Sequence, residues 1–225
     1  MNSMYQQLMQ LPLFQGVSTE KITALVEKLP FHFLKLRNGE QVFAAGDPCT
    51  HIKFIVSGQV RIEMSFPNQR ITMRQTVHNP HVLAAEYLFG RETSYPYTAI
   101  SDGGCGILQL RKGDYLKMIT SDKVFLFNIL NYLSSGSQRS VQLPLSVSDG
   151  SVAERLAMIV DALAITGATD IVLHYKQKDL STLLGTQRTT LVSTLDRLAD
   201  QDILEYDSKE MSILNLDGLL NYNKD

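Results

Sequence analysis

The sequence predicts an α+β fold with three parts: a β-rich N-terminal domain, a long helix and a C-terminal domain of short helices. The first observation is a series of short β-branched or alternating runs between residues 31 and 112, separated by turn residues. The second is an apolar stretch without turn residues that begins near Asp122 and has the length of a long helix. The third is a pair of short leucine-striped segments around Gly185, which predicts two helices joined by a tight turn.

Length and composition restrict the class of protein. A chain of 225 residues is long for one domain and sufficient for two, and 44% hydrophobic residues are typical of a globular protein. The amino terminus lacks a basic region followed by an apolar run, and no stretch has the roughly 18 apolar residues of a membrane helix. We therefore expect a cytoplasmic protein that does not contact a membrane. Cys49 and Cys105 are too few for a disulfide framework or an all-cysteine iron–sulfur cluster.

The N-terminal part, residues 1–120, is predicted to be helical over residues 4–30 and then β-rich. The predicted strands are HFLKL, QVFAA, IKFIVSG, QVRIEMS, RITMRQTV, YTAIS and GILQL. Turn signals between them include Ser57-Gly58, Pro67-Asn68 and Asp102-Gly103-Gly104. Many short strands with frequent turns favour a sandwich or a double-stranded β-helix (jelly roll).

Residues 121–145 are predicted to hold one long helix, from about Asp122 to Gln142, that ends before Pro144. Its first half has more apolar residues than one helical face can hold: Val124, Phe125, Leu126, Phe127, Ile129, Leu130 and Leu133. This excess predicts a second surface that a partner subunit covers. Ser146 to Gly150 is predicted to be a hinge-like linker.

The C-terminal part, residues 146–225, combines helices with a β-hairpin. Ser151 and Glu154 match a capping box, which opens a helix, and a strand is predicted at about Asp170 to His174. Two leucine-striped helices follow within Gln177 to Leu204. The runs ILEYD and MSILNL then flank Ser208-Lys209, which predicts a hairpin wing. This order of elements predicts a winged helix-turn-helix.

The second leucine-striped helix carries the candidate DNA-reading side chains. Gly185 is expected to take positive φ at the turn, and Thr186 to cap the next helix through its hydroxyl. Arginine pairs bidentately with guanine, and threonine offers a hydroxyl and a methyl group to thymine. The predicted DNA-binding residues are Thr186, Gln187, Arg188, Thr189, Thr190, Ser193 and Arg197. The alternative is an ordinary helical hairpin with a polar solvent face.

The charge distribution argues against DNA binding. The net charge is −2, and from residue 150 onward seven lysine and arginine residues stand against twelve aspartate and glutamate residues, a balance of −5. DNA-binding domains are usually basic because phosphate contacts dominate their affinity. The few cations of this part must therefore be well placed.

The β-roll, long helix and winged helix together resemble the Crp/Fnr family of bacterial transcription regulators over about residues 10 to 216. The matching positions are the glycines of Gly46-Asp47 and Gly58, and Gly185, Arg188, Thr190, Leu191, Leu195 and Leu198 in the helix-turn-helix. The resemblance implies a homodimer on a palindromic operator in double-stranded DNA, RNA polymerase as a further partner of an activator, and no enzymatic activity. The family's glutamate is Thr189 here and its second arginine is Ser193, so we expect a different operator, with Arg188 as the retained base contact.

The family's effector site is altered further. Aligned on Phe89, the ribose-binding glutamate is replaced by Ala85 and the phosphate-binding arginine by Tyr95. A shift of one residue recovers Glu86 but supplies no arginine, although Arg91 is nearby. We therefore expect no certain cofactor, and another small effector or none in place of cyclic AMP. The candidate effector-pocket residues are Ala85, Glu86, Tyr95, Tyr97 and Ser140.

Three alternatives remain open from the sequence. One is the same regulator without a ligand, which a roll filled by Tyr95 and Tyr97 favours; the two tyrosines otherwise suit a half-buried strand pair. The second is a β-roll metal enzyme that uses His78 and His81, although no third ligand or catalytic residue is evident. The third is an interaction module that has lost its affinity for DNA.

Overall fold

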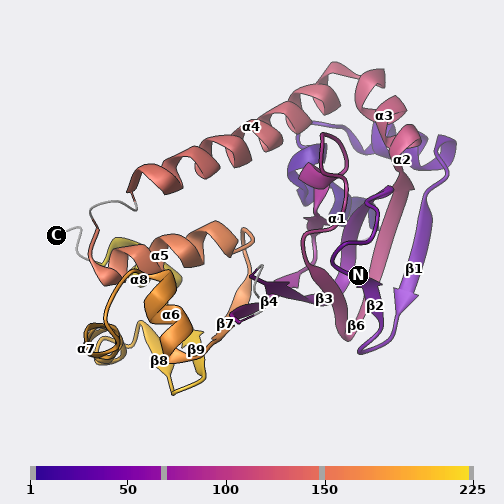
Figure 1. Ribbon diagram of the computed structural model, residues 1–225. Helices are drawn as coiled ribbons and strands as arrows, with labels where there is room; N and C mark the ends of the chain where they lie inside the picture. The colour runs from indigo at the N-terminus through magenta and orange to yellow at the C-terminus, as the bar shows by residue number, and fades with distance from the viewer. Residues whose placement is uncertain (1–3, 67–69, 147–149, 223–225) are drawn as a thin grey trace. The chain divides into compact units, whose positions relative to one another are not determined.

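The computed structural model describes residues 4–66, 70–146 and 150–222, and confirms the α+β class. The chain forms two compact units (Figure 1). The roll unit comprises Met1–Ile62 and Val77–Gly136, and the winged unit comprises Glu63–Thr76 and Ser137–Asp225. A segment from the middle of the predicted β-rich domain therefore belongs structurally to the winged unit.

The roll unit is an antiparallel sheet, with helices before its first strand and after its last strand. Its strands are β1 (His32–Leu36), β2 (Gln41–Phe43), β3 (His51–Ser65), β4 (Thr72–His78), β5 (His81–Leu83) and β6 (Thr98–Arg111). Its helices are α1 (Met4–Gln10), η1 (Pro12–Phe14), α2 (Thr19–Lys28), η2 (Ala85–Tyr87), α3 (Lys112–Ser121) and α4 (Lys123–Ser146). Strand β6 pairs with β1, β2 and β3, and β5 pairs with β3; β3, β4 and α4 continue into the winged unit.

Two predicted turns are wrong, because β3 and β6 pass without interruption through Ser57-Gly58 and Asp102-Gly103-Gly104. Gly58 has φ +74°, and a Cβ atom there would lie 2.2 Å from the carbonyl oxygen of Gly104. Glycine within a strand often marks a close approach of two backbones. The glycines therefore let two long neighbouring strands touch, where a turn would have ended them.

The core of the roll unit extends onto one side of α4. Phe14 of η1 packs edge-to-face against Phe54 of β3 and Phe125 of α4, with ring centroids 5.7 Å apart in both pairs. Phe125 and Ile129 are buried. Helix α4 continues to Ser146, so the prediction that Pro144 ends it is wrong. Proline removes its own N–H donor but leaves the donors of the following residues available, which allows a helix to continue past it.

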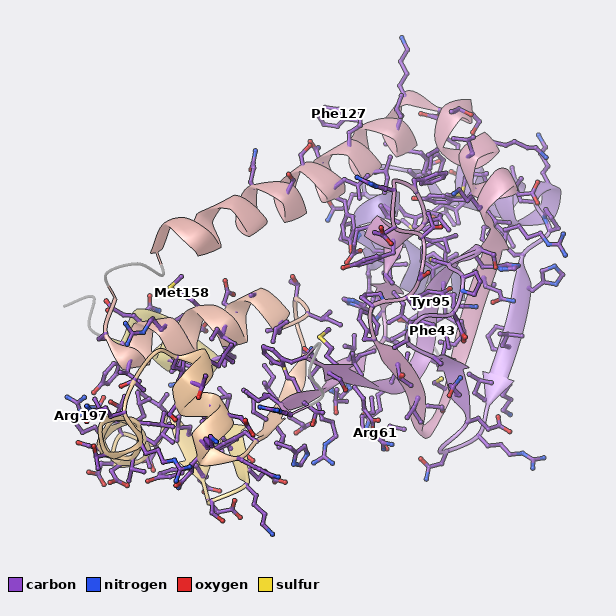
Figure 2. All side chains as sticks on the ribbon, in the orientation of Figure 1. Phe43, Arg61, Tyr95, Phe127, Met158 and Arg197 are labelled. Atoms are coloured by element: carbon purple, nitrogen blue, oxygen red, sulfur yellow. The ribbon has the colours of Figure 1, made fainter. Side chains whose placement is uncertain are left out.

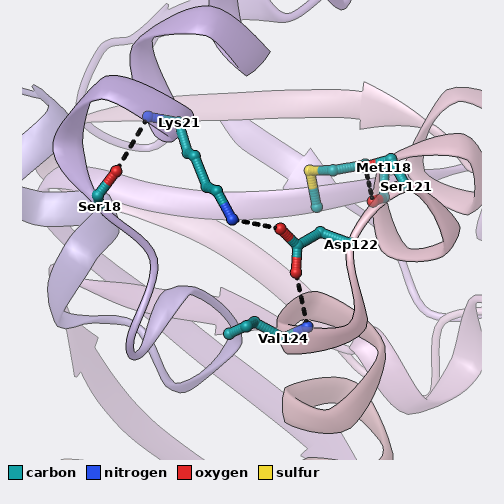
Figure 3. Close-up of polar contacts among 6 residues, drawn as sticks. All are labelled: Ser18, Lys21, Met118, Ser121, Asp122 and Val124. Carbon is teal, nitrogen blue, oxygen red and sulfur yellow. Dashed lines mark hydrogen bonds and ion pairs between the residues drawn. The ribbon is translucent and has the colours of Figure 1, made fainter.

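Asp122 joins α2 to the start of α4 (Figure 3). Its carboxylate accepts a hydrogen bond from Lys21 Nζ at 2.6 Å and another from the backbone N–H of Val124 at 2.8 Å. Ser18 caps α2 by accepting the backbone N–H of Lys21. Helix α4 therefore begins directly after a residue that is tied to α2.

Acidic pH is expected to weaken this junction. The hydrogen bonds from Lys21 and from the Val124 amide lower the pKa of Asp122 below its ordinary value. A carboxyl group with a lowered pKa stabilises the fold above its unfolded-state pKa of about 4, and this contribution is lost as the pH falls through the folded-state value. Asp122→Asn should therefore unfold at lower urea concentration than the wild type at pH 7 and approach it as the pH falls through the folded-state pKa of Asp122. A difference that stays constant with pH would contradict this account.

The winged unit packs helices against a four-stranded antiparallel sheet in the order β4-β7-β9-β8. Its further elements are α5 (Val152–Leu163), β7 (Thr169–His174), α6 (Gln177–Leu183), α7 (Arg188–Ala199), β8 (Leu204–Tyr206), β9 (Glu210–Ile213) and α8 (Leu216–Asn221). The buried core of the winged unit is formed by apolar side chains from its helices and its sheet, among them Leu156, Val160, Leu180, Leu184, Leu191, Leu195, Leu198 and Met211. The predicted strand before the helix-turn-helix and the predicted wing are both confirmed.

The predicted capping box is confirmed, because Ser151 and Glu154 cap each other's backbone at the start of α5. Gly185 takes φ +58° as predicted, but Thr186 does not cap α7. The backbone N–H of Thr186 instead donates to Ser181 O at 2.9 Å, and that of Gly185 to Thr182 O at 3.2 Å. This Schellman pattern lengthens the turn by one residue, so Gln187 becomes the N-cap of α7.

Two predictions concern residues that the structure describes in part or not at all. Residues 147–149 of the predicted hinge lie outside the described residues, and so does the side chain of Ser140. In the described part of the chain, no helix is both long and apolar enough to span a lipid bilayer.

Candidate DNA interface and effector pocket

Helix α7 presents a polar surface above a buried leucine face. Leu191, Leu195 and Leu198 are fully buried in the winged unit. Six of the seven predicted DNA-binding side chains are exposed, and Thr186 is half-buried; the exposed ones are Gln187, Arg188, Thr189, Thr190, Ser193 and Arg197. The first turn of α7 therefore offers an arginine and hydroxyl groups to solvent.

The two arginines of α7 lie at opposite ends of the helix. Arg188 is its first residue, whereas Arg197, labelled in Figure 2, is in its last turn. Arg197 donates a 3.4 Å hydrogen bond to Thr194 Oγ1. Nine residues of helix separate them by about 13 Å along the axis. They consequently cannot address the same base pair.

The wing is attached directly to α7. Tyr206, the last residue of β8, donates a hydrogen bond from its hydroxyl to the carboxylate of Asp196 in α7. This hydrogen bond raises the pKa of Tyr206 to about 12. The outer flank of α7 and the end of the wing are therefore held together by a contact that leucine periodicity does not reveal.

Aromatic side chains fill the predicted effector position in the roll unit. Tyr95 and Tyr97 lie in the loop before β6 and are almost fully buried, so the half-buried strand pair is wrong. The Tyr95 ring stacks on Phe43 with centroids 3.7 Å apart and planes 10° apart, and Tyr97 packs on the same ring at 5.6 Å (Figure 2). The Tyr95 hydroxyl donates to His51 O at 3.3 Å. Burial raises the pKa of both tyrosines.

Two of the other candidate pocket residues, Ala85 and Glu86, are described with their side chains, and the charge of Glu86 adds to the rise in the pKa of Tyr97. Ala85 is buried, whereas Glu86 is exposed. Burial raises the pKa of Tyr132 in α4, and a hydrogen bond with Glu86 raises it further. Tyr132 was not predicted; its position three residues after the buried Ile129, on the inward face of the helix, is the signal that could have found it.

The arrangement does not fit a cyclic phosphate held by an ion pair. Between Val82 and Thr98 the single lysine or arginine is Arg91, and its side chain is exposed. A buried anion needs a cationic or hydrogen-bonding partner, and an arginine is the usual partner of a phosphate. At the position that the resemblance assigns to that arginine, the roll holds the buried Tyr95 ring.

The histidine pair lies at the turn between β4 and β5. His78 is exposed, and burial lowers the pKa of the half-buried His81 to about 4. Within the described residues, no three histidine, cysteine, aspartate or glutamate side chains are grouped to hold a metal ion. The geometry thus supplies no third ligand beside the pair.

An antiparallel β-roll, a long helix and a winged helix-turn-helix with an exposed polar reading face define a two-domain DNA-binding regulator. The comparisons with known proteins agree with this class. The family model "Cyclic nucleotide-binding domain" matches residues 33–122, and "Crp-like helix-turn-helix domain" matches residues 151–222. The chain therefore belongs to the Crp/Fnr family, and its fold is that of a Crp/Fnr-type transcription regulator.

Solved structures show the same fold at low sequence identity. The Thermus thermophilus catabolite activator protein is 19% identical over 93% of this chain and 98% of its own, with a TM-score of 0.51. The sensor domain of the transcriptional regulator DNR from Pseudomonas aeruginosa is 19% identical over 61% of this chain and 90% of its own, with a TM-score of 0.50. A comparison with curated proteins gives no significant match.

Proposed function

We propose that the chain is a cytoplasmic, homodimeric transcription regulator that reads a palindromic operator with the first turns of α7. The observation that carries this proposal is the exposure of Arg188, Thr189 and Ser193 above the buried leucines of α7. Arg188 is assigned to a guanine, and the two hydroxyl side chains to base edges or phosphates nearby. We assign Arg197, at the far end of α7, to a phosphate of the DNA backbone.

A second copy of the chain is the proposed occupant of the outer face of α4. Leu126, Phe127, Leu130 and Leu133 are 36–64% exposed, whereas Phe125 and Ile129 of the same turns are buried. Figure 2 shows Phe127 on the side of α4 that points away from the β-strands. An apolar stripe along a helix suits self-association about a two-fold axis, which matches the symmetry of a palindrome.

We assign sensing to residues 1–120, dimerisation to 121–145 and DNA binding to 146–225, with the segment Glu63–Thr76 added structurally to the last of these. An activator would contact RNA polymerase as a further partner. No catalytic step is assigned to the chain. A metal enzyme based on His78 and His81 has no supporting third ligand among the described residues.

A regulator without a ligand is a second candidate, and the buried stack of Tyr95 on Phe43 favours it. The Tyr95 ring occupies the position that the resemblance assigns to the phosphate-binding arginine, so an aromatic surface stands where a cyclic phosphate would need a cation. Cyclic AMP is therefore not the proposed effector. Millimolar cyclic AMP should leave the thermal midpoint of the protein unchanged, because a ligand stabilises a fold only by binding it. A rise of several degrees with cyclic AMP would contradict this assignment.

Selection of random duplex DNA by the purified protein tests the function itself. We expect enrichment of an inverted repeat with half-sites about 10 base pairs apart, at low salt and at physiological salt. The protein should also sediment as a dimer. A monomeric protein that enriches no sequence at either salt concentration would favour the interaction module instead.

A further inference from the structure

The hairpin segment Glu63–Thr76, between β3 and β4, is built into the winged unit. Strand β4 pairs with β7, with Thr72 opposite His174 and Met73 opposite Leu173. Met73 is fully buried in the leucine core of the winged unit.

Gln75 fixes the same segment by side-chain hydrogen bonds. It is fully buried, donates to Leu163 O at 2.9 Å and accepts the backbone N–H of Ile165 at 2.8 Å. A buried amide with both groups satisfied holds its strand firmly in place. The charges of the hairpin therefore have defined positions on the winged unit.

Arg70 lies at the end of this hairpin beside the start of α6. The antiparallel register that places Thr72 opposite His174 brings Arg70 next to the end of β7 and to Lys176. Its Nη1 atom is 3.5 Å from Asp179 Oδ1 in α6, and 65% of its side chain is exposed. The Asp179 side chain is only 15% exposed, but most of the Arg70 side chain faces solvent, and a guanidinium has five N–H donors with which it can engage a phosphate while it stays beside Asp179.

Three lysines lie at the same end of the sheet. Lys176 and Lys178 are exposed, and so is Lys209 in the wing, whose carbonyl oxygen accepts the backbone N–H of Tyr175 at 2.8 Å. We call Arg70, Lys176, Lys178 and Lys209 the hairpin–wing surface.

Three acidic residues beside this surface, Asp179, Asp207 and Glu210, have partners within the fold. Glu210 faces His174 at 3.0 Å, and Asp207 accepts the backbone N–H groups of Lys209 and Glu210 at 2.7 Å each. Asp179 faces Arg70. The hairpin itself adds two arginines and one glutamate to residues 150–225, whose own balance is −5.

We propose that the hairpin–wing surface contacts the phosphate backbone of duplex DNA, and that Arg70, from the β-rich part of the sequence, is one of its phosphate ligands. This inference rests on the proposed DNA-binding function. The wing adjoins the C-terminal half of α7 through Tyr206 and Asp196, so the surface lies beside the half of the reading helix that follows Ser193. A guanidinium binds a phosphate through two parallel N–H donors, and such contacts add affinity without adding base specificity.

The test measures equilibrium binding of the full chain to two labelled duplexes, one with the selected repeat and one of random sequence, over a series of salt concentrations. Arg70→Gln should weaken both duplexes by the same factor, about 5-fold or more at low salt, and reduce the salt slope by about 0.9 for each lost phosphate contact. Asp179→Asn should leave binding unchanged or strengthen it, because it removes a negative charge near the phosphates. Thermal midpoints of both variants establish that they are folded.

The two variants separate phosphate contact from a structural role. If Arg70 only secures the hairpin through Asp179, both substitutions will weaken binding alike and lower the thermal midpoint, which overturns the proposal. A changed sequence preference in Arg70→Gln overturns it too. If the wild type shows no preference for any repeat but Arg70→Gln still weakens random duplex, the phosphate surface stands and the sequence-specific function fails. An absence of binding to any duplex overturns both.

Discussion

Replacement of Arg188 by alanine is expected to abolish selective binding to the operator. A bidentate arginine–guanine contact contributes about 1–3 kcal/mol of discrimination, and a dimer makes this contact once in each half-site. The loss should therefore be about 30-fold or more on the selected repeat and much smaller on random duplex. Arg188 is exposed at the first position of α7, so the substitution leaves the leucine core intact. Equilibrium titration of both duplexes measures the difference.

Arg188→Lys is the matched control for this experiment. Lysine keeps the positive charge but lacks the planar fork that pairs with two acceptors of guanine. Selectivity should be lost in the lysine variant while affinity for random duplex is retained. If lysine restored full selectivity, Arg188 would be acting as a phosphate contact and the proposed base readout would be wrong.

Acidic side chains at Phe127 and Leu130 are expected to convert the protein to monomers. These residues are 64% and 53% exposed on α4, so the double substitution Phe127→Glu and Leu130→Glu costs the isolated chain little. In a dimer, four carboxylates would meet across an apolar contact without partners. A monomer engages one half-site at a time, so operator affinity should fall by about 100-fold or more. Analytical ultracentrifugation and operator titration measure the two effects.

Phe33→Glu provides a matched control for the dimer experiment. Phe33 is 54% exposed but lies on β1, away from the stripe on α4. This variant should remain a dimer and bind the operator normally. A dimeric Phe127→Glu, Leu130→Glu variant with wild-type affinity would show that the exposed face of α4 is not the interface.

The secondary structure of the winged unit was predictable because its signals are local. The leucine spacing of α7, the capping box of Ser151 and Glu154, and the glycine at the turn each depend on residues within a few positions of one another. The prediction that Thr186 caps α7 was wrong for an equally local reason, because the Schellman turn uses one residue more than the pattern suggests.

The roll unit was less predictable where two distant strands decide the role of a residue. Gly58 and Gly104 stand in sequences that are typical of turns, but their conformation allows a close contact between β3 and β6. Alignment of the sequence with the family placed Tyr95 at the position of the phosphate-binding arginine. It could not predict that the Tyr95 ring stacks on Phe43, because Phe43 lies on a strand about fifty residues earlier.

The sequence by itself determined the family, the order of domains and the polar surface of α7, because hydrophobic periodicity and turn chemistry act over a few residues. Only the tertiary structure decided that Tyr95 fills the roll, and that the hairpin carrying Arg70 belongs to the winged unit. Both outcomes depend on long-range packing. The side chains that bury Met73 and the backbone groups that satisfy Gln75 come from segments about ninety residues later in the chain, and no local pattern specifies that pairing.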